Sequence, residues 1–420
     1  MAVDDDSLGT AMGGGGDSPK DGAATVWRSD GFTGGLRIQP NPPEIAPKSD
    51  GANPDEPKAT SDMPALMDEL VEEIILRIPP DEPAHLVRAA LVCKPWHRIV
   101  SDRGFLRRYR ELHRTPRLLG YIQNLFSGKV QIPRFAPTCA VPSFSLSAQP
   151  DREWWALDCR HGRVLIEICY VPTGLMVWDP ITGDQHHLST RADPCFSFAA
   201  AVLCATDSCD HIDCHGDPFR VVFVGTNIVG HEYVTWASIY SLETGAWSAS
   251  TSIVTQYYVK DKPSLLIGNA LYFTLAHDVS ILKYDLDRHG LCEIAAPGVF
   301  GAIVVNTENS GLGFVCVQDN IIYLLSQQAS ANGIAGPGWA ELTVIKLETL
   351  LPKNNPFLRN VVGFAEGTDI VFISTDVGVF TLELKSGKVR KVGEKGGHYA
   401  ILPYMSIYTP NLAKDRLSPP

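Results

Sequence analysis

Residues 162–168 read GRVLIEI and residues 175–183 read LMVWDPITG, two apolar runs of which the second ends in a Thr-Gly turn. Variants of this unit recur, with FRVVFVG at 219–225, WASIYSLETGAW at 236–247 and GVFTLELKSG at 378–387. Short runs of β-branched and aromatic residues bounded by turn residues are typical of strands, and glycine accepts the positive φ that a strand reversal needs. The repeated unit therefore predicts a chain built mainly from antiparallel strands.

The repeats also have a regular spacing. The glycines that close them are Gly183, Gly245, Gly290 and Gly387. If a further repeat ends around Leu347, the mean spacing is about 50 residues, the period of a kelch-like β-propeller blade and not the ~40–45 of a WD repeat. A single blade cannot bury both faces, so blades must pack on one another around a closed ring. Five clear repeats, with strands at 118–122 and near 399–408, predict about six blades in a ring that both ends of the segment close.

Residues 62–113 have a helical period instead. The apolar positions of the first stretch form one stripe at helical spacing: Leu66, Leu70, Ile74, Ile75 and Ile78. Pro79 and Pro80 end this stretch, Pro83 can open a second helix, and a third begins around Pro95. Three short helices form only a small core, so the unit would gain stability by docking its remaining apolar surface on a partner.

The order and spacing within this helical segment are more specific than three helices. Residues 66–79 (LMDELVEEIILRIP), 86–96 (LVRAALVCKPW) and 105–109 (FLRRY) resemble the F-box motif, in which Val-Cys-Lys-x-Trp is the most recognisable element. Met67 stands where the family usually has proline. The resemblance implies a segment that docks on the Skp-type adaptor of cullin–RING ubiquitin ligases, while the rest of the chain captures a substrate.

Within the F-box segment, the apolar helix positions are the candidates for contact with the adaptor. These adaptor-binding candidates are Leu66, Leu70, Ile74, Leu86, Val92 and Trp96. Large apolar and aromatic side chains serve both as interface anchors and as core residues. For several of them, Val92 and Trp96 especially, the alternative is that they hold the helices together.

Residues 117–408 resemble the F-box-associated β-propeller region of plant F-box proteins, with CRHGRVL at 159–165 and VWDPITG at 177–183. Together the two resemblances imply the substrate-recognition subunit of a Skp–cullin–F-box ubiquitin ligase, which is not itself an enzyme because other subunits carry out ubiquitin transfer. Two alternatives stay open. The propeller could be a protein-interaction module that recruits no ligase, or a propeller enzyme that uses the mouth of the channel.

The expected organisation has four parts: a disordered, acidic, Gly/Pro-rich arm at 1–61, the helical F-box unit at 62–113, the propeller at 114–408 and a tail at 409–420. The 420 residues carry 36 Lys and Arg against 47 Asp and Glu, a net charge of −11. This acidic balance argues against broad binding to nucleic acids or anionic membranes. The N-terminus lacks the basic and apolar regions of a signal peptide, so we expect an intracellular protein of the cytoplasm and/or nucleus.

One loop gathers metal-binding residue types, namely Cys204, Cys209, His211, Cys214 and His215. Thiols and imidazoles in this number can bind zinc, but their spacing matches no paired Cys-x-x-Cys knuckle, and propeller strands need no metal to fold. The sequence therefore favours a polar loop here, with no metal and no cofactor.

The remaining polar clusters have simpler explanations. His186 and His187 are adjacent in a strand and point to opposite faces, which disfavours chelation, and Asp285 and Asp287 are typical turn formers. A basic run occupies 103–117, with Arg103, Arg107, Arg108, Arg110, Arg114 and Arg117. It has few interleaved aromatic residues, so we expect a solvated or domain-bridging face more than a nucleic-acid patch. We therefore expect no catalytic residues.

Overall fold

The computed structural model describes residues 67–80, 83–113, 117–127, 130–138, 154–168, 174–180, 183–189, 195–206, 209, 211, 214, 217–307, 311–327, 338–352, 359–396 and 398–406. The predicted arm at 1–61 and tail at 409–420 lie outside these residues. Within the described part of the chain, no helix is long and apolar enough to cross a membrane.

Within its described residues, the helical unit contains four helices rather than the expected three. They are α1 (Asp68–Leu76), α2 (Pro83–Val92), α3 (Lys94–Ser101) and α4 (Arg103–His113). The third predicted stretch divides because Asp102 is extended, with ψ 133°, and its carboxylate accepts a hydrogen bond from the Phe105 backbone N–H at 3.0 Å. This is an N-cap, which satisfies a backbone donor at the start of α4. The sequence analysis missed α4 as a separate helix because its many arginines obscured its apolar stripe.

A small apolar core holds the four helices together. Its central side chains include Ile75, Val100, Phe105 and Tyr109, all almost fully buried. The Tyr109 hydroxyl donates a hydrogen bond to the Ile78 carbonyl at 2.9 Å, which ties α4 to the end of α1. Four helices with one shared core correspond to the compact helical unit that the periodicity predicted.

The arginine face of α4 is solvated and paired with acids. Arg108 lies 2.5 Å from both Glu72 and Glu73 of α1, and Arg107 lies 2.8 Å from Glu111 of its own helix. Exposed pairs of this kind contribute little stability, but they neutralise the positive charge that a nucleic acid would need. The pairing supports the expectation of a solvated face.

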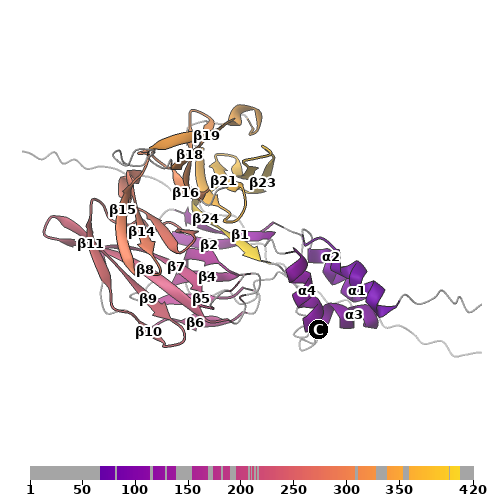
Figure 1. The fold of residues 1–420 in the computed structure, drawn as a ribbon. Coiled ribbons are helices and arrows are strands. Elements are labelled where there is room, and N and C mark those ends of the chain that lie inside the picture. The colour runs from indigo at the N-terminus through magenta and orange to yellow at the C-terminus, as the bar shows by residue number, and fades with distance from the viewer. Residues whose placement is uncertain are drawn as a thin grey trace, which may run out of the picture. The chain divides into compact units, whose positions relative to one another are not determined.

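The strands form six antiparallel sheets, here called blades 1 to 6 (Figure 1). Blade 1 contains β1 (Arg117–Ser127), β2 (Val130–Pro137) and β24 (His398–Ser406). Blade 2 contains β3 (Trp154–Arg160), β4 (Arg163–Ile168), β5 (Leu175–Trp178) and β6 (Gln185–His187). Blade 3 contains β7 (Ser197–Cys204), β8 (Phe219–Val229), β9 (Glu232–Ser241), β10 (Ala246–Trp247) and β11 (Thr251–Thr255).

The remaining three blades have four strands each. Blade 4 contains β12 (Leu265–Ile267), β13 (Ala270–Thr274), β14 (Ser280–Asp285) and β15 (Gly290–Ala295). Blade 5 contains β16 (Ile303–Asn306), β17 (Leu312–Gln318), β18 (Ile321–Gln327) and β19 (Trp339–Lys346). Blade 6 contains β20 (Asn360–Phe364), β21 (Ile370–Thr375), β22 (Gly378–Glu383) and β23 (Val389–Gly393). This mainly-β propeller confirms the predicted β-propeller fold and its six blades.

Blade 1 closes the ring, as predicted. Its strands β1 and β24 come from the two ends of the propeller segment and pair antiparallel, with Ile122 opposite Leu402 (Figure 1). The hydrogen bonds between β1 and β24 join the two ends of the propeller segment within one sheet, which closes the ring.

Among the described residues, six apolar clusters alternate with the six blades, one between each neighbouring pair. Trp154 belongs to the cluster between blades 1 and 2, whereas the next residue, Trp155, belongs to the cluster between blades 2 and 3. Successive side chains of a strand point to opposite faces, so every blade is buried on both faces. The near-continuous burial of β3 and β4 follows from this sandwich arrangement.

The turn glycines behave as predicted at three of four positions. Gly183, Gly245 and Gly387 have φ between 63° and 79°. At the fourth turn, His289 instead takes the positive φ of 51°, and Gly290 begins β15. Histidine tolerates the left-handed conformation better than branched residues do, so the reversal shifts by one residue.

Candidate functional site

Helix α1 has two apolar faces. Val71 and Ile75 point into the helical core, while Leu70 and Ile74 are 48% and 54% exposed. The two exposed residues are four positions apart and therefore neighbours on the helix surface. The sequence analysis placed Ile74 and Ile75 on one stripe, and the structure separates them onto two faces.

The other predicted adaptor-binding residues are divided between surface and core. Val92, at the end of α2, is 63% exposed. Leu86 is 1% exposed in the helical core, and Trp96 packs partly buried against the same core. Leu66 lies outside the described residues. The structure therefore gives Leu86 and Trp96 the core role that the sequence analysis left open as an alternative, and Leu70, Ile74 and Val92 stay candidates for contact.

Two further exposed apolar side chains at α1 and α2 were missed, and a third, Leu112 on α4, is 55% exposed. Met67, just before α1, is 63% exposed, and Leu91, beside Val92, is 73% exposed. The helical period of α2 could have found Leu91, because Leu86, Ala89 and Ala90 turn inward and leave the last two residues outside. We call Met67, Leu70, Ile74, Leu91 and Val92 the exposed apolar set of the helical unit.

A cavity of about 340 Å³ lies in the propeller channel, and every blade contributes to its lining. Most of its walls come from β24, β3, β16 and β20 and from the chain just before and within β12. The turn after β3 and the connection between β7 and β8 complete it with His161, His211 and Cys214. The cavity therefore collects side chains that are distant in the sequence.

A buried ion network crosses this channel. Arg160, with a side chain 5% exposed, lies 2.6 Å from Asp158 of the same strand and 2.5 Å from Glu366, which follows β20 in blade 6. Its guanidinium also donates to the Ser264 carbonyl at 2.8 Å, next to blade 4. The carboxylate of Asp158 accepts the Val202 backbone N–H at 2.8 Å, in blade 3. One arginine thus links blade 2 to blades 4 and 6, and its partner Asp158 links blade 2 to blade 3.

Burial controls the protonation of this network. Desolvation raises the pKa of Asp158 to about 6, although the nearby Arg160 guanidinium lowers it. The two carboxylates hold the pKa of Arg160 above its ordinary value, against the effect of its burial. Arg160, Asp158 and Glu366 are therefore committed to one another and to backbone groups, an arrangement typical of structural support.

The structure also shows the positions of the turn residue Asp285 and of the adjacent histidines His186 and His187. Asp285 is a turn former, since its carboxylate accepts the backbone N–H groups of Asp287 and Arg288 at 3.1 and 3.0 Å. His186 and His187 are exposed on β6, and the His186 ring lies against Phe219. In the described part of the chain, neither histidine belongs to a group of potential metal ligands.

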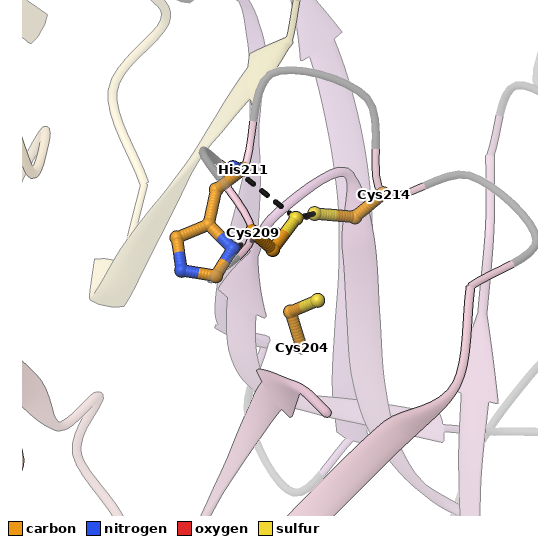
Figure 2. A group of neighbouring side chains, drawn as sticks. All are labelled: Cys204, Cys209, His211 and Cys214. Atoms are coloured by element: carbon orange, nitrogen blue, oxygen red, sulfur yellow. Dashed lines mark hydrogen bonds between the residues drawn. The ribbon is translucent and has the colours of Figure 1, made fainter. Parts of the chain in front are cut away.

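The sequence favoured a plain polar loop between β7 and β8, but the structure gathers four potential metal ligands there. The ligand atoms of Cys204, Cys209, His211 and Cys214 all lie within 4.8 Å of one another (Figure 2). His215, the fifth candidate, lies outside the described residues. The spacing argument did not anticipate this cluster, because the fold, and not a local knuckle, brings Cys204 at the end of β7 next to the three others.

The comparisons with solved structures give low similarity scores. Hsv2 of Kluyveromyces lactis, with complete loop 6CD, is 12% identical with a TM-score of 0.34 over 56% of this chain and 62% of that chain. TolB of Acinetobacter baumannii is 12% identical with a TM-score of 0.32 over 71% of this chain and 69% of that chain. This chain thus spans less than two thirds of the Hsv2 chain. These values are too low to support an argument about function.

The comparison with protein families is decisive. A family model described as F-box protein AT5G49610-like, beta-propeller, matches residues 155–412, more than half of the chain. The F-box domain model matches residues 65–108, which include α1 to α3. A search of curated proteins found no match. The six-bladed propeller behind a four-helix unit agrees with both family models, and the chain belongs to the family of F-box proteins with an AT5G49610-like β-propeller.

Proposed function

We propose that this protein is the substrate-recognition subunit of a Skp–cullin–F-box ubiquitin ligase. The observation that carries the proposal is the F-box match at 65–108 in front of a propeller match at 155–412. F-box domains generally bind Skp-type adaptors, so the helical unit would dock on the adaptor and through it on a cullin–RING ligase. The propeller would hold a target protein. We also keep the kelch-like class of the blades as part of this proposal.

The exposed apolar set of the helical unit supports adaptor docking. Leu70 and Ile74 on α1 and Leu91 and Val92 on α2 are each at least 48% exposed, although they are large and apolar. The core of the helical unit is complete without them. Exposed apolar side chains on a small helical unit gain free energy when a partner covers them.

In this proposal the chain acts by positioning. A receptor that holds a target beside a ubiquitin-charged enzyme raises the effective concentration of the target's lysines. The chain then needs no nucleophile, no cofactor and no nucleic-acid or membrane surface of its own. We place it inside the cell, in the cytoplasm and/or nucleus. In support, eight cysteines among the described residues are free thiols, as is usual in reducing compartments.

A binding experiment with a purified Skp-type adaptor tests the proposal. We expect the full chain to bind, and L70D/I74D to lose binding by roughly a thousandfold, about 2 kcal/mol for each buried anchor. The matched control is L342D/V344D, because Leu342 and Val344 on β19 are 55% and 49% exposed and similar in chemistry. Circular dichroism should show both double variants folded.

The two alternatives predict other outcomes. If the folded wild-type chain does not bind the adaptor, the propeller is an interaction module that recruits no ligase. The enzyme alternative predicts an acid or base in the channel that is free to act on a substrate, whereas Asp158, Arg160 and Glu366 there are paired with one another.

A further inference from the structure

The connection between β7 and β8 is built around four metal-binding side chains. Cys204 is the last residue of β7, and Cys209, His211 and Cys214 follow before β8 begins at Phe219. Figure 2 shows the three sulfur atoms and the imidazole turned toward a common centre. Cys214 is buried, and His211 and Cys214 also line the channel cavity.

The distances between these atoms fit a tetrahedral zinc ion. The Cys209 and Cys214 sulfurs lie 3.6 Å apart, and the Cys214 sulfur lies 3.6 Å from His211 Nδ1. With Zn–S bonds of about 2.3 Å and Zn–N bonds of about 2.0–2.1 Å, tetrahedral angles place two sulfurs roughly 3.8 Å apart and a sulfur and a nitrogen roughly 3.6 Å apart. All four ligand atoms lie within 4.8 Å of one another, so a small inward movement completes the set.

Backbone groups already support the sulfurs. The Thr206 N–H donates to the Cys204 sulfur at 3.4 Å, and the His211 N–H donates to the Cys209 sulfur at 3.4 Å. Hydrogen bonds of this kind stabilise the thiolate form, in which cysteine binds a metal. Both donors lie two residues after the sulfur they contact, so the loop itself supplies them.

His161 of the β3–β4 turn and Arg163, the first residue of β4, hold the loop from outside. The His161 ring stacks on the His211 ring at 4.0 Å and 9°, and its Nδ1 accepts the Cys204 backbone N–H at 3.2 Å. Arg163, 3% exposed, donates to the Cys214 carbonyl and to the Asp217 carbonyl. Outer contacts of this kind orient metal ligands. Three thiolates, a neutral imidazole and Zn²⁺ have a net charge of −1, which the buried Arg163 guanidinium offsets.

We propose that Cys204, Cys209, His211 and Cys214 bind one zinc ion in a closed structural site. Three sulfurs and one imidazole nitrogen are a common donor set of structural zinc, and soft thiolates disfavour calcium and magnesium. Binding displaces the protons of the three thiols, and no bond is made or broken elsewhere. With four protein ligands the ion has no open position, so its role is to fix a wall of the channel cavity and not to catalyse a reaction. This inference does not depend on the ligase proposal.

Metal analysis of the full-length chain tests the site. We expect about one zinc per chain after purification under reducing conditions without chelator. C209S and C214S should each lose most of the metal, while C292S should keep it, because Cys292 is an exposed thiol on β15 outside the cluster. H161A should weaken zinc binding by about 10- to 100-fold in a chelator competition, since His161 orients a ligand without being one.

A cobalt titration of the wild-type chain tests the same site without relying on the serine variants to fold. The wild-type chain, stripped of metal and titrated with Co²⁺, should develop the thiolate-to-cobalt and d–d absorption of a tetrahedral site, saturating at one equivalent. A folded wild-type chain that holds no zinc and takes up no cobalt would overturn the proposal. So would non-reducing peptide mapping that finds Cys209 and Cys214 joined in a disulfide in chain purified without reductant.

Discussion

Removal of the Arg160 guanidinium is the most informative perturbation of the propeller. In Arg160→Met a side chain of similar volume replaces the one cation that pairs with Asp158 at 2.6 Å and Glu366 at 2.5 Å. Asp158 is then a buried carboxylate without its cation, although it still accepts a hydrogen bond from the Val202 N–H. Glu366 still accepts a hydrogen bond from the Leu266 N–H at 3.1 Å. Taking one partner from a buried pair costs about 3–5 kcal/mol, because the other charge stays desolvated.

The effect is large enough for a thermal unfolding experiment. For a domain of this size, each kcal/mol moves Tm by roughly 2–4 °C, so we expect Arg160→Met to lower Tm by roughly 6–20 °C at pH 7. The control is Arg220→Met, because Arg220 is exposed on β8. The Tm of both variants is measured at one scan rate, either by far-ultraviolet circular dichroism or by differential scanning calorimetry.

A triple variant separates unpaired charge from lost packing. In D158N/R160M/E366Q no buried ion remains, and replacing a whole buried network by neutral groups is often close to neutral. We therefore expect the triple variant to recover most of the Tm that Arg160→Met loses. The reasoning is refuted if Arg160→Met unfolds at the same temperature as Arg220→Met, or if the triple variant is less stable than the single one.

Two other predictions concern close packing and pH. A Cβ at Gly363 would lie 2.5 Å from a backbone oxygen of β24, so Gly363→Ala should lower the free energy of unfolding in urea by about 1–3 kcal/mol. Gly290→Ala is the control and should be nearly neutral, because a Cβ there would have no atom within 4 Å. Equal stability of the two variants would contradict this prediction. Burial raises the pKa of Asp158 from 3.8 to about 6, so its contribution to stability is present below pH 4 and lost as pH rises to about 6. The unfolding free energy of the wild type should fall relative to Asp158→Asn across this range, and a difference that stays level would contradict the shift.

Much of the fold was predictable because its determinants are local. The alternation of apolar residues and the Thr-Gly turns depend on a few neighbouring residues, and they correctly predicted six blades and ring closure. The helical segment was predicted for the same reason, apart from the break at Asp102. There an N-cap bond from Phe105 to the Asp102 carboxylate outweighs a continuous helical period.

The candidate sites were less predictable because they depend on long-range contacts. Whether an apolar residue such as Ile74 or Ile75 faces the core is decided by about 100° of helix rotation, and only the packing of α1 against the other helices settles it. Arg160 and Glu366 are paired only because the closed ring places blades 2 and 6 on either side of blade 1, around one channel. No local pattern marks either residue.

Hydrophobic period and turn chemistry act over a few residues, so they predicted a helical unit followed by a ring of antiparallel blades, and the resemblance of 66–109 to the F-box motif added the family. Which apolar side chains stay exposed and which polar ones meet depends on packing between distant segments. The stacked rings of His161 and His211 are an example. They belong to connections in two different blades, and the closed ring supplies the proximity that sequence spacing cannot express.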